Sequence, residues 1–179
     1  MKQRLNTLDI PLSLLAIRFA VNQKTIVMKK LQIEGFQVIG IAARTKNENG
    51  QAKQDIGALW QKLMAENIIT KIPNIVDQTI YGLYTDYESD HNGYYTTILG
   101  YKVSSLDNIP DGMVGKRIES ANYTEFIAKG DLTSNAVIDV WSEIWKLDLD
   151  RTYQADFETY GEKASNPVDG EAEIYISIN

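Results

Sequence analysis

The sequence predicts an α+β fold made of two tandem β-α-β-β units. The same order of strand and helix patterns occurs twice, and glycines recur at one spacing along the chain. Gly93 and Gly170 each open the last strand of their half and are 77 residues apart. Gly35 and Gly112 precede the first strands and have the same separation. Matching offsets of this kind indicate an internal repeat.

A turn-rich segment at residues 108–112 (NIPDG) separates the two halves. Pro and Gly interrupt regular structure, and a segment this short is not a flexible linker. We therefore expect one domain over residues 28–179, with repeat one at 28–107 and repeat two at 108–179. Residues 1–27 form an N-terminal extension.

The first half begins with a strand pattern at residues 32–46. A helix pattern follows at 55–69, and strand patterns return at 79–88 and 94–104. Apolar residues with a period of about 3.6 define one face of this helix. They are Ile56, Leu59, Trp60, Leu63 and Met64.

The second half repeats this order, with strand patterns at residues 113–128, 153–160 and 172–178. A helix pattern lies between the first two, at residues 134–147. Its apolar face is formed by Val137, Ile138, Trp141, Ile144 and Trp145. The halves therefore predict the same secondary structure in the same order.

The N-terminal extension contains an apolar run at residues 10–21. Basic residues precede it, as in a secretory signal, but Pro11 and Arg18 interrupt the run and no small-residue cleavage site follows. The run is also too short to span a bilayer. Residues at helical spacing instead predict an amphipathic helix that packs on the domain or on a second copy. They are Leu12, Leu15, Ala16 and Phe19.

Composition limits the classes of partner. The chain has 179 residues, 44% of them hydrophobic, and its net charge is −6 without any basic cluster. Direct nucleic-acid binding is disfavoured, because phosphate contacts need concentrated Lys and Arg, whereas cations are attracted. The absence of cysteine fits a reducing compartment, so we expect a cytoplasmic protein that does not bind membranes.

Two strand segments carry a carboxylate with a tyrosine two residues later. Side chains alternate along a strand, so Glu173 and Tyr175 share one face of the last strand while its isoleucines occupy the other. Glu158 and Tyr160 are related in the same way one strand earlier. A carboxylate beside an aromatic ring is a minimal site for an organic cation. We expect Glu173 to be the main anchor and Glu158 the second.

Aromatic residues supply candidate walls for such a site. Tyrosines in strands are also common for packing reasons alone, and tryptophans on apolar helix faces more often belong to the core. The tyrosine candidates, besides the two above, are Tyr84, Tyr87 and Tyr95. Trp60 and Trp141 are included because helix ends beside a groove can lend a ring to a ligand.

No motif indicates catalysis, a metal or a cofactor. His91 is the sole histidine and falls in a turn-like segment between two strands, where we expect a solvent-exposed turn residue. The phosphate-binding loop, dinucleotide and zinc-protease motifs are absent from the sequence. We expect no catalytic residues, no metal ligands and no cofactor.

Several segments taken together resemble the GyrI-like or AraC-type effector-binding domains over residues 28–179. The first half contributes FQVIGIAART (36–45), TIYGLYTDYES (79–89) and GYYTTILGYKV (93–103). The second contributes YTEFIAKGD (123–131), DFETYGE (156–162) and AEIYISI (172–178). The resemblance is to members of the family that are encoded on integron cassettes and bind cationic drugs.

The resemblance implies a pseudo-twofold pair of β-α-β-β units. These would form an antiparallel sheet with helices on one face and a ligand groove on the other, preceded by the N-terminal helix. Many family members follow a DNA-binding domain, which residues 1–27 are too few to supply. The expected function is therefore that of a stand-alone module that binds lipophilic or aromatic cations.

Two other functions remain open from the sequence. Some GyrI-like proteins are small-molecule hydrolases, and here Glu173 or Glu158 could act as a general base. The chain could also be an interaction subunit that passes a ligand signal to a gyrase or a separate regulator. In that case the N-terminal helix could mediate the contact, or a homodimer.

Overall fold

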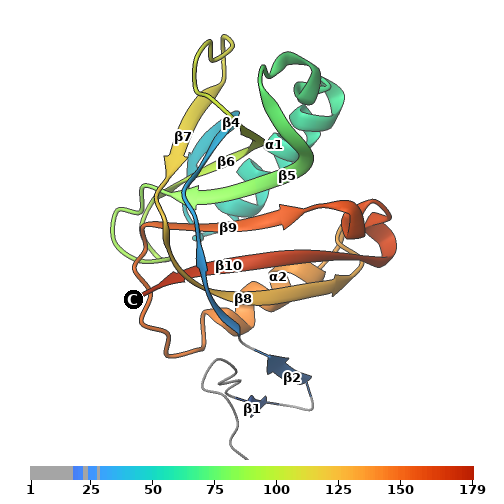
Figure 1. The fold of residues 1–179 in the computed structure, drawn as a ribbon. Helices are drawn as coiled ribbons and strands as arrows, with labels where there is room; N and C mark the ends of the chain where they lie inside the picture. Colours follow the sequence, from blue (N-terminus) through green and yellow to red (C-terminus); the bar gives the residue numbers. More distant parts are fainter. Residues whose placement is uncertain (1–17, 22–23, 28) are drawn as a thin grey trace, which may run out of the picture.

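The computed structural model describes residues 18–21, 24–27 and 29–179, and its centre is one eight-stranded antiparallel sheet (Figure 1). The strand order is β3-β8-β10-β9-β5-β6-β4-β7. The strands are β3 (Lys29–Ile33), β4 (Phe36–Thr45), β5 (Ile75–Thr85), β6 (Tyr95–Val103), β7 (Val114–Ile118), β8 (Ala121–Gly130), β9 (Ala155–Tyr160) and β10 (Gly170–Ile178). The helices are α1 (Gln51–Ala65) and α2 (Ala136–Ile144), with short 3-10 turns η1 (Ile68–Lys71), η2 (Glu162–Ala164) and η3 (Pro167–Asp169).

The repeated order of elements is confirmed. The first unit is β4-α1-β5-β6 and the second is β8-α2-β9-β10. The two units meet where β5 pairs with β9, at the middle of the sheet. The fold is therefore the α+β pair of β-α-β-β units that the sequence predicts.

Two long segments interlock the units. β3 pairs with β8 of the second unit, and after a two-residue break the chain continues as β4 in the first unit. In the same way β7 pairs with β4 and then continues as β8. Each edge strand thus belongs by pairing to one unit and by sequence to the other.

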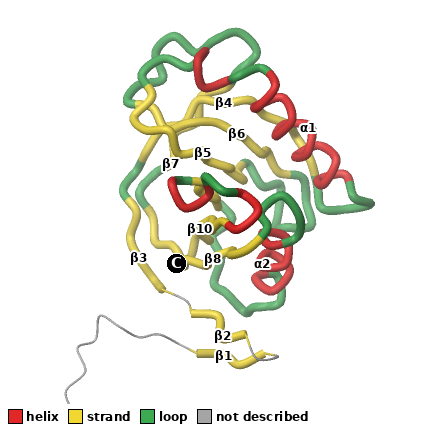
Figure 2. Tube along the Cα trace, turned by 90° about the vertical axis from the view of Figure 1, so that its right-hand side faces the viewer, coloured by secondary structure: helices red, strands yellow, loops and turns green. Residues whose placement is uncertain are grey.

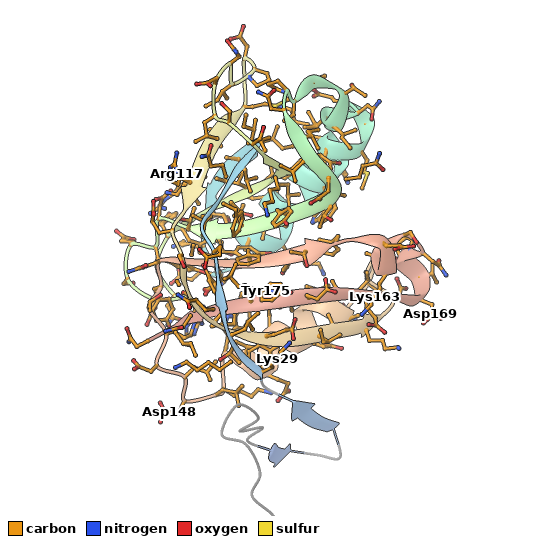
Figure 3. All side chains as sticks on the ribbon, in the orientation of Figure 1. Lys29, Arg117, Asp148, Lys163, Asp169 and Tyr175 are labelled. Carbon is orange, nitrogen blue, oxygen red and sulfur yellow. The ribbon has the colours of Figure 1, made fainter. Side chains whose placement is uncertain are left out.

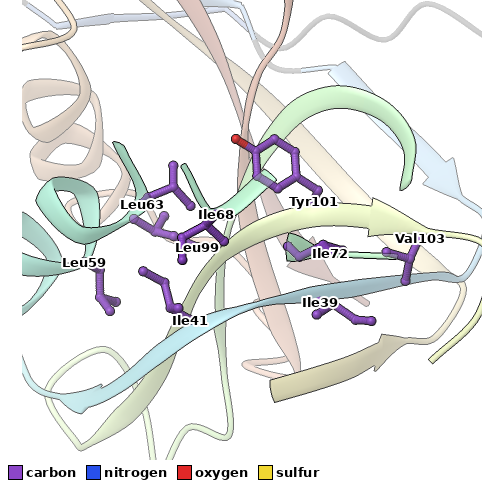
Figure 4. Packing of buried hydrophobic residues seen from close by; sticks show 9 residues of the cluster. All are labelled: Ile39, Ile41, Leu59, Leu63, Ile68, Ile72, Leu99, Tyr101 and Val103. Carbon is purple, nitrogen blue, oxygen red and sulfur yellow. The ribbon is translucent and has the colours of Figure 1, made fainter. Parts of the chain in front are cut away.

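Both helices lie on the same side of the sheet (Figure 2). α1 buries Leu59 and Leu63 against β4 and β6, in an aliphatic cluster that includes Ile41 and Leu99 (Figure 4). α2 buries Trp141 and Ile144 against β8 and β10. Among the described residues, no helix combines the length and apolar character needed to cross a bilayer.

The opposite face of the sheet has a core of its own. It contains Phe36, Tyr123 and Phe157, with Tyr81 and Tyr175 packed against them. Gly40 and Gly100 face each other where β4 and β6 pair. A Cβ on Gly100 would lie 2.1 Å from the Ile39 carbonyl oxygen, so only glycine permits this approach.

The N-terminal extension differs from its prediction. Arg18–Val21 (β1) and Lys24–Val27 (β2) form an antiparallel two-stranded hairpin. Phe19, the last residue of the expected helix, therefore lies in a strand. The other residues of that expected helix, Leu12, Leu15 and Ala16, lie outside the described residues. Val21, Thr25, Ile26 and Val27 are β-branched, which favours strands.

Candidate functional site

A large cavity with a volume of about 1370 Å³ lies between α1 and α2. It is therefore on the helix side of the sheet, whereas the sequence led us to expect the ligand groove on the opposite face. The helices cover only the two ends of the sheet face, so the central strands β5 and β9 form an open floor between them. Seven of the expected site residues line it: Trp60, Tyr84, Tyr87, Tyr95, Trp141, Glu158 and Tyr160.

Glu158 is the charged group at the floor of this cavity. Its side chain points to the helix side from β9, opposite Gly82 on β5, and it is 2% exposed. A Cβ on Gly82 would lie 3.3 Å from the Glu158 Oε2 atom, so glycine leaves room for the carboxylate. The floor of the cavity therefore has a single carboxylate at its centre.

Neutral donors surround the Glu158 carboxylate. Oε1 accepts hydrogen bonds from the Tyr84 hydroxyl at 2.9 Å and the Trp141 Nε1–H at 2.5 Å. Oε2 accepts one from the Tyr160 hydroxyl at 2.6 Å. Burial and the neighbouring carboxylate raise the pKa of both phenols well above the usual value, so they stay protonated and donate.

The carboxylate has no cationic partner within the described part of the chain. Burial therefore raises the pKa of Glu158, although the three hydrogen bonds to Tyr160, Trp141 and Tyr84 oppose this shift. Desolvation of a charge without an opposite charge is costly. The cavity thus contains a buried carboxylate that has hydrogen-bond donors but no compensating positive charge from the residues that the structure describes.

This pKa shift predicts that the stability of the protein depends on pH. Because the folded-state pKa of Glu158 is raised, its contribution to stability is greatest below the unfolded pKa and falls as pH rises through the folded pKa. The Glu158→Gln variant has no such titration. We expect the melting temperature of the variant minus that of wild type, both measured by circular dichroism without ligand, to increase from pH 4.5 to pH 7.5. A constant difference across that range would contradict the shift.

The walls of the cavity are aromatic and come from both units. The ring of Tyr84 lies edge-on to Trp141 with centroids 5.2 Å apart, and to Tyr95 at 5.9 Å. Trp60 of α1 meets Tyr160 of β9 edge-on at 4.9 Å. These contacts position ring faces around Glu158, where they can receive a cation.

A second acidic residue near the cavity already has its counter-ion. Asp156 is fully buried, and its Oδ2 accepts hydrogen bonds from Arg151 Nη2 at 2.6 Å and from the Tyr87 hydroxyl at 2.8 Å. Its Oδ1 accepts from the backbone N–H and the hydroxyl of Ser177. Asp156 thus has its counter-ion within the protein, whereas Glu158 is the buried acid of the cavity without one among the described residues. The other acid that lines the cavity, Glu162, is exposed.

Two aromatic lining residues, Trp145 and His91, were not among the site residues expected from the sequence. Their rings stack with centroids 5.9 Å apart and planes 9° apart. His91 lies in a turn, as expected, but it is half-buried rather than solvent-exposed, because Trp145 stacks beside its ring. Trp145 was detectable, since it follows Trp141 by one helical turn. Within the described residues, no three His, Asp or Glu side chains form a group that could hold a metal ion.

Glu173 and Tyr175 lie outside this cavity, contrary to the expectation that Glu173 and Glu158 share a site. Glu173 pairs with Thr159 across β10 and β9, whereas Glu158 pairs with Ile174. Directly paired residues share a face, so the two glutamates point to opposite sides of the sheet. Figure 3 shows Tyr175 on the side away from the helices.

Residues 31–178 match the model of the family of integron-associated effector binding proteins. The chain belongs to this family. The match spans both units of the sheet and includes all the cavity residues described above. Members of this family are described as effector binding proteins, so the cavity between the helices is the candidate effector site.

Individual relatives agree with this assignment. An integron cassette protein from the mobile metagenome of Vibrio cholerae is 32% identical, with a TM-score of 0.67, covering 85% of this chain and 95% of that one. The regulator-like protein YobU of Bacillus subtilis (strain 168) is 29% identical over 143 residues, or 78% of this chain and 89% of YobU. The protein SAV2435, in a structure bound to tetraphenylphosphonium, has the same fold at 21% identity, with a TM-score of 0.69 and coverage of 85% and 93%.

Proposed function

We propose that this protein binds lipophilic aromatic cations in the cavity between α1 and α2, with Glu158 as the anchor, and that it does so without turnover. One observation carries the proposal: a fully buried carboxylate on the cavity floor has neutral hydrogen-bond donors and no cationic partner among the described residues. A bound cation would supply the missing charge. Its binding would remove the cost of desolvating Glu158.

The hydrogen bonds around Glu158 favour a particular kind of cation. Tyr84 and Trp141 already donate to Oε1 and Tyr160 to Oε2, so little acceptor capacity remains for a ligand N–H. A cation without strong donors loses less on leaving water and can place its substituents against the rings. The cavity volume of about 1370 Å³ admits bulky aromatic groups.

The tetraphenylphosphonium complex of SAV2435 supports this ligand class, since that cation has four aryl groups and no hydrogen-bond donor. A binding role also fits the surroundings of Glu158. A general base needs a lone pair directed at water or substrate, and here the three neutral donors compete for both carboxylate oxygens.

A titration with a matched pair of compounds tests the charge requirement. Methyltriphenylphosphonium and triphenylphosphine oxide share three aryl groups and differ mainly in charge. We expect saturable quenching of tryptophan fluorescence by the cation, because Trp60, Trp141 and Trp145 line the cavity, and binding at least about tenfold weaker for the oxide. Equal affinity for the two compounds would overturn the proposal. Conversion of an ester-bearing cation by the protein would instead favour the hydrolase.

A further inference from the structure

A second, smaller cavity opens on the sheet face opposite the helices, with a volume of about 270 Å³. Four aromatic rings form its floor, and we call it the aromatic cup. Its lining residues are Ile33, Glu34, Phe36, Tyr81, Lys102, Phe157, Thr159 and Tyr175. Tyr175 stacks on Phe157 with centroids 4.7 Å apart, and Phe36 meets Phe157 edge-on at 5.2 Å. The cup therefore presents preformed aromatic surface.

Carboxylates border the aromatic cup. Thr159, which lines it, donates from its hydroxyl to Glu173 Oε2 at 2.7 Å. Glu173 pairs with Thr159 across the strands and Thr159 pairs with Tyr81, so these residues share one face with Tyr175. Burial raises the pKa of Tyr81 to about 12, with Asp77 and then Glu173 contributing. Burial also raises the pKa of Tyr175, with contributions from Glu125, which accepts a hydrogen bond from its hydroxyl at 3.2 Å, and from Glu173. Within the described residues Glu173 has no ion-pair partner. The exposed Glu34 is a second acid at the rim.

The protein already places one cation beside these rings. The Lys102 ammonium lies 5.8 Å from the centroid of Phe36, at the edge of the cup. A long aliphatic stem carries this group, so it can move aside. Its position indicates that the rim and rings attract positive charge.

We propose that the aromatic cup is a second cation site, specific for a guanidinium group, with Glu173 as its carboxylate. A planar guanidinium stacks on Tyr81 or Tyr175 and directs its N–H groups at Glu173 in a way that a round phosphonium cannot. The volume of about 270 Å³ excludes tetraaryl cations, which the large cavity admits. The two faces of the sheet therefore sort organic cations by size and shape.

Nuclear magnetic resonance titration of the full chain with methylguanidinium tests the site. We expect saturable shifts of the Tyr81, Thr159 and Tyr175 amides, and the same titration with neutral methylurea should leave them in place. Glu173→Gln should weaken binding at least about threefold, whereas Lys102→Met should strengthen it about two- to fivefold by removing the competing ammonium. A gain of affinity cannot result from misfolding.

Three results would overturn the site: shifts that do not saturate, equal shifts with methylurea, or binding that Glu173→Gln leaves unchanged. Glu158→Gln separates the two cavities, since it should not alter methylguanidinium binding. N-acetyl-arginine amide distinguishes the sources of the group. Tighter binding than methylguanidinium would mean that the cup holds an arginine side chain of another protein, and equal binding would mean a free guanidinium compound.

Discussion

Glu158→Gln is expected to weaken binding of methyltriphenylphosphonium about 10- to 100-fold. The substitution keeps the size of the side chain and removes the charge that a bound cation would neutralise. Two unit charges roughly 6 Å apart attract each other by about 3 kcal/mol at an effective dielectric constant of about 20, and each 1.4 kcal/mol is a factor of ten in affinity. Isothermal titration calorimetry at pH 7.5 measures the difference directly.

Glu173→Gln is the matched control for this experiment. It removes one carboxylate of the same type from the other face of the sheet, where it does not line the large cavity. Its affinity for the phosphonium should stay within about twofold of wild type, since Glu173 lies on the opposite face of the sheet and salt screens charges that are not in contact. Equal losses in the two variants would point to the net charge of the protein, and loss in Glu173→Gln alone would restore the anchor expected from the sequence.

Arg151→Leu is expected to lower the free energy of unfolding by about 3–5 kcal/mol, because it leaves a buried carboxylate without its counter-ion. The Arg151 and Asp156 side chains are 5% and 0% exposed, so water cannot replace the lost partner. For a chain of this length the change corresponds to a melting temperature lower by roughly 10 °C. Differential scanning calorimetry provides the measurement.

The double variant Arg151→Leu, Asp156→Asn tests the cause. Removing both charges should restore part of the lost stability, because the cost arises from the unpaired carboxylate rather than from the missing arginine stem. If the double variant is no more stable than Arg151→Leu, loss of the contact between the guanidinium and the Tyr153 ring, whose centroid is 4.4 Å from the guanidinium carbon, accounts for the destabilisation.

The elements of the fold were predictable from the sequence because both units have clear periodicities. Alternation along residues 172–178 identified a buried isoleucine face, and the helical spacing at Trp141 and Ile144 identified the buried side of α2. Family resemblance then supplied the pairing of the units, which no local pattern contains. Seven of the nine expected site residues line the large cavity, and six of them lie on strands and helices whose faces repeat regularly, whereas Tyr87 lies in the loop after β5.

The main error concerned which face of β10 lies on the same side of the sheet as the acidic face of β9. Alternation within β10 separates Glu173 from Ile174, and alternation within β9 separates Glu158 from Phe157, but neither relates one strand to the other. That relation depends on register, where a shift of one residue exchanges the faces. The structure pairs Ile174 with Glu158, so the apolar face of β10 and the acidic face of β9 are the same side of the sheet.

The remaining differences arise from contacts between segments distant in sequence. His91 belongs to a turn by its local sequence, and only the position of α2 brings Trp145 over it. Asp156 and Arg151 are likewise a pair that spacing alone does not reveal, because the intervening chain must turn for the two side chains to meet. A local sequence pattern predicts the secondary structure of a segment, whereas these contacts depend on the tertiary packing of segments against one another.

The interlocked edge strands bear on the origin of the single carboxylate. One β-α-β-β unit alone would leave β3 or β7 without its partner strand, so it could complete this sheet only by exchanging that strand with an identical copy. Two identical copies would place the same residue on both sides of the twofold axis, and two buried carboxylates there would repel each other. When the two units are joined in one chain, their sequences can differ. One unit can then contribute the acid Glu158 to the cavity while the other contributes tyrosines to its wall.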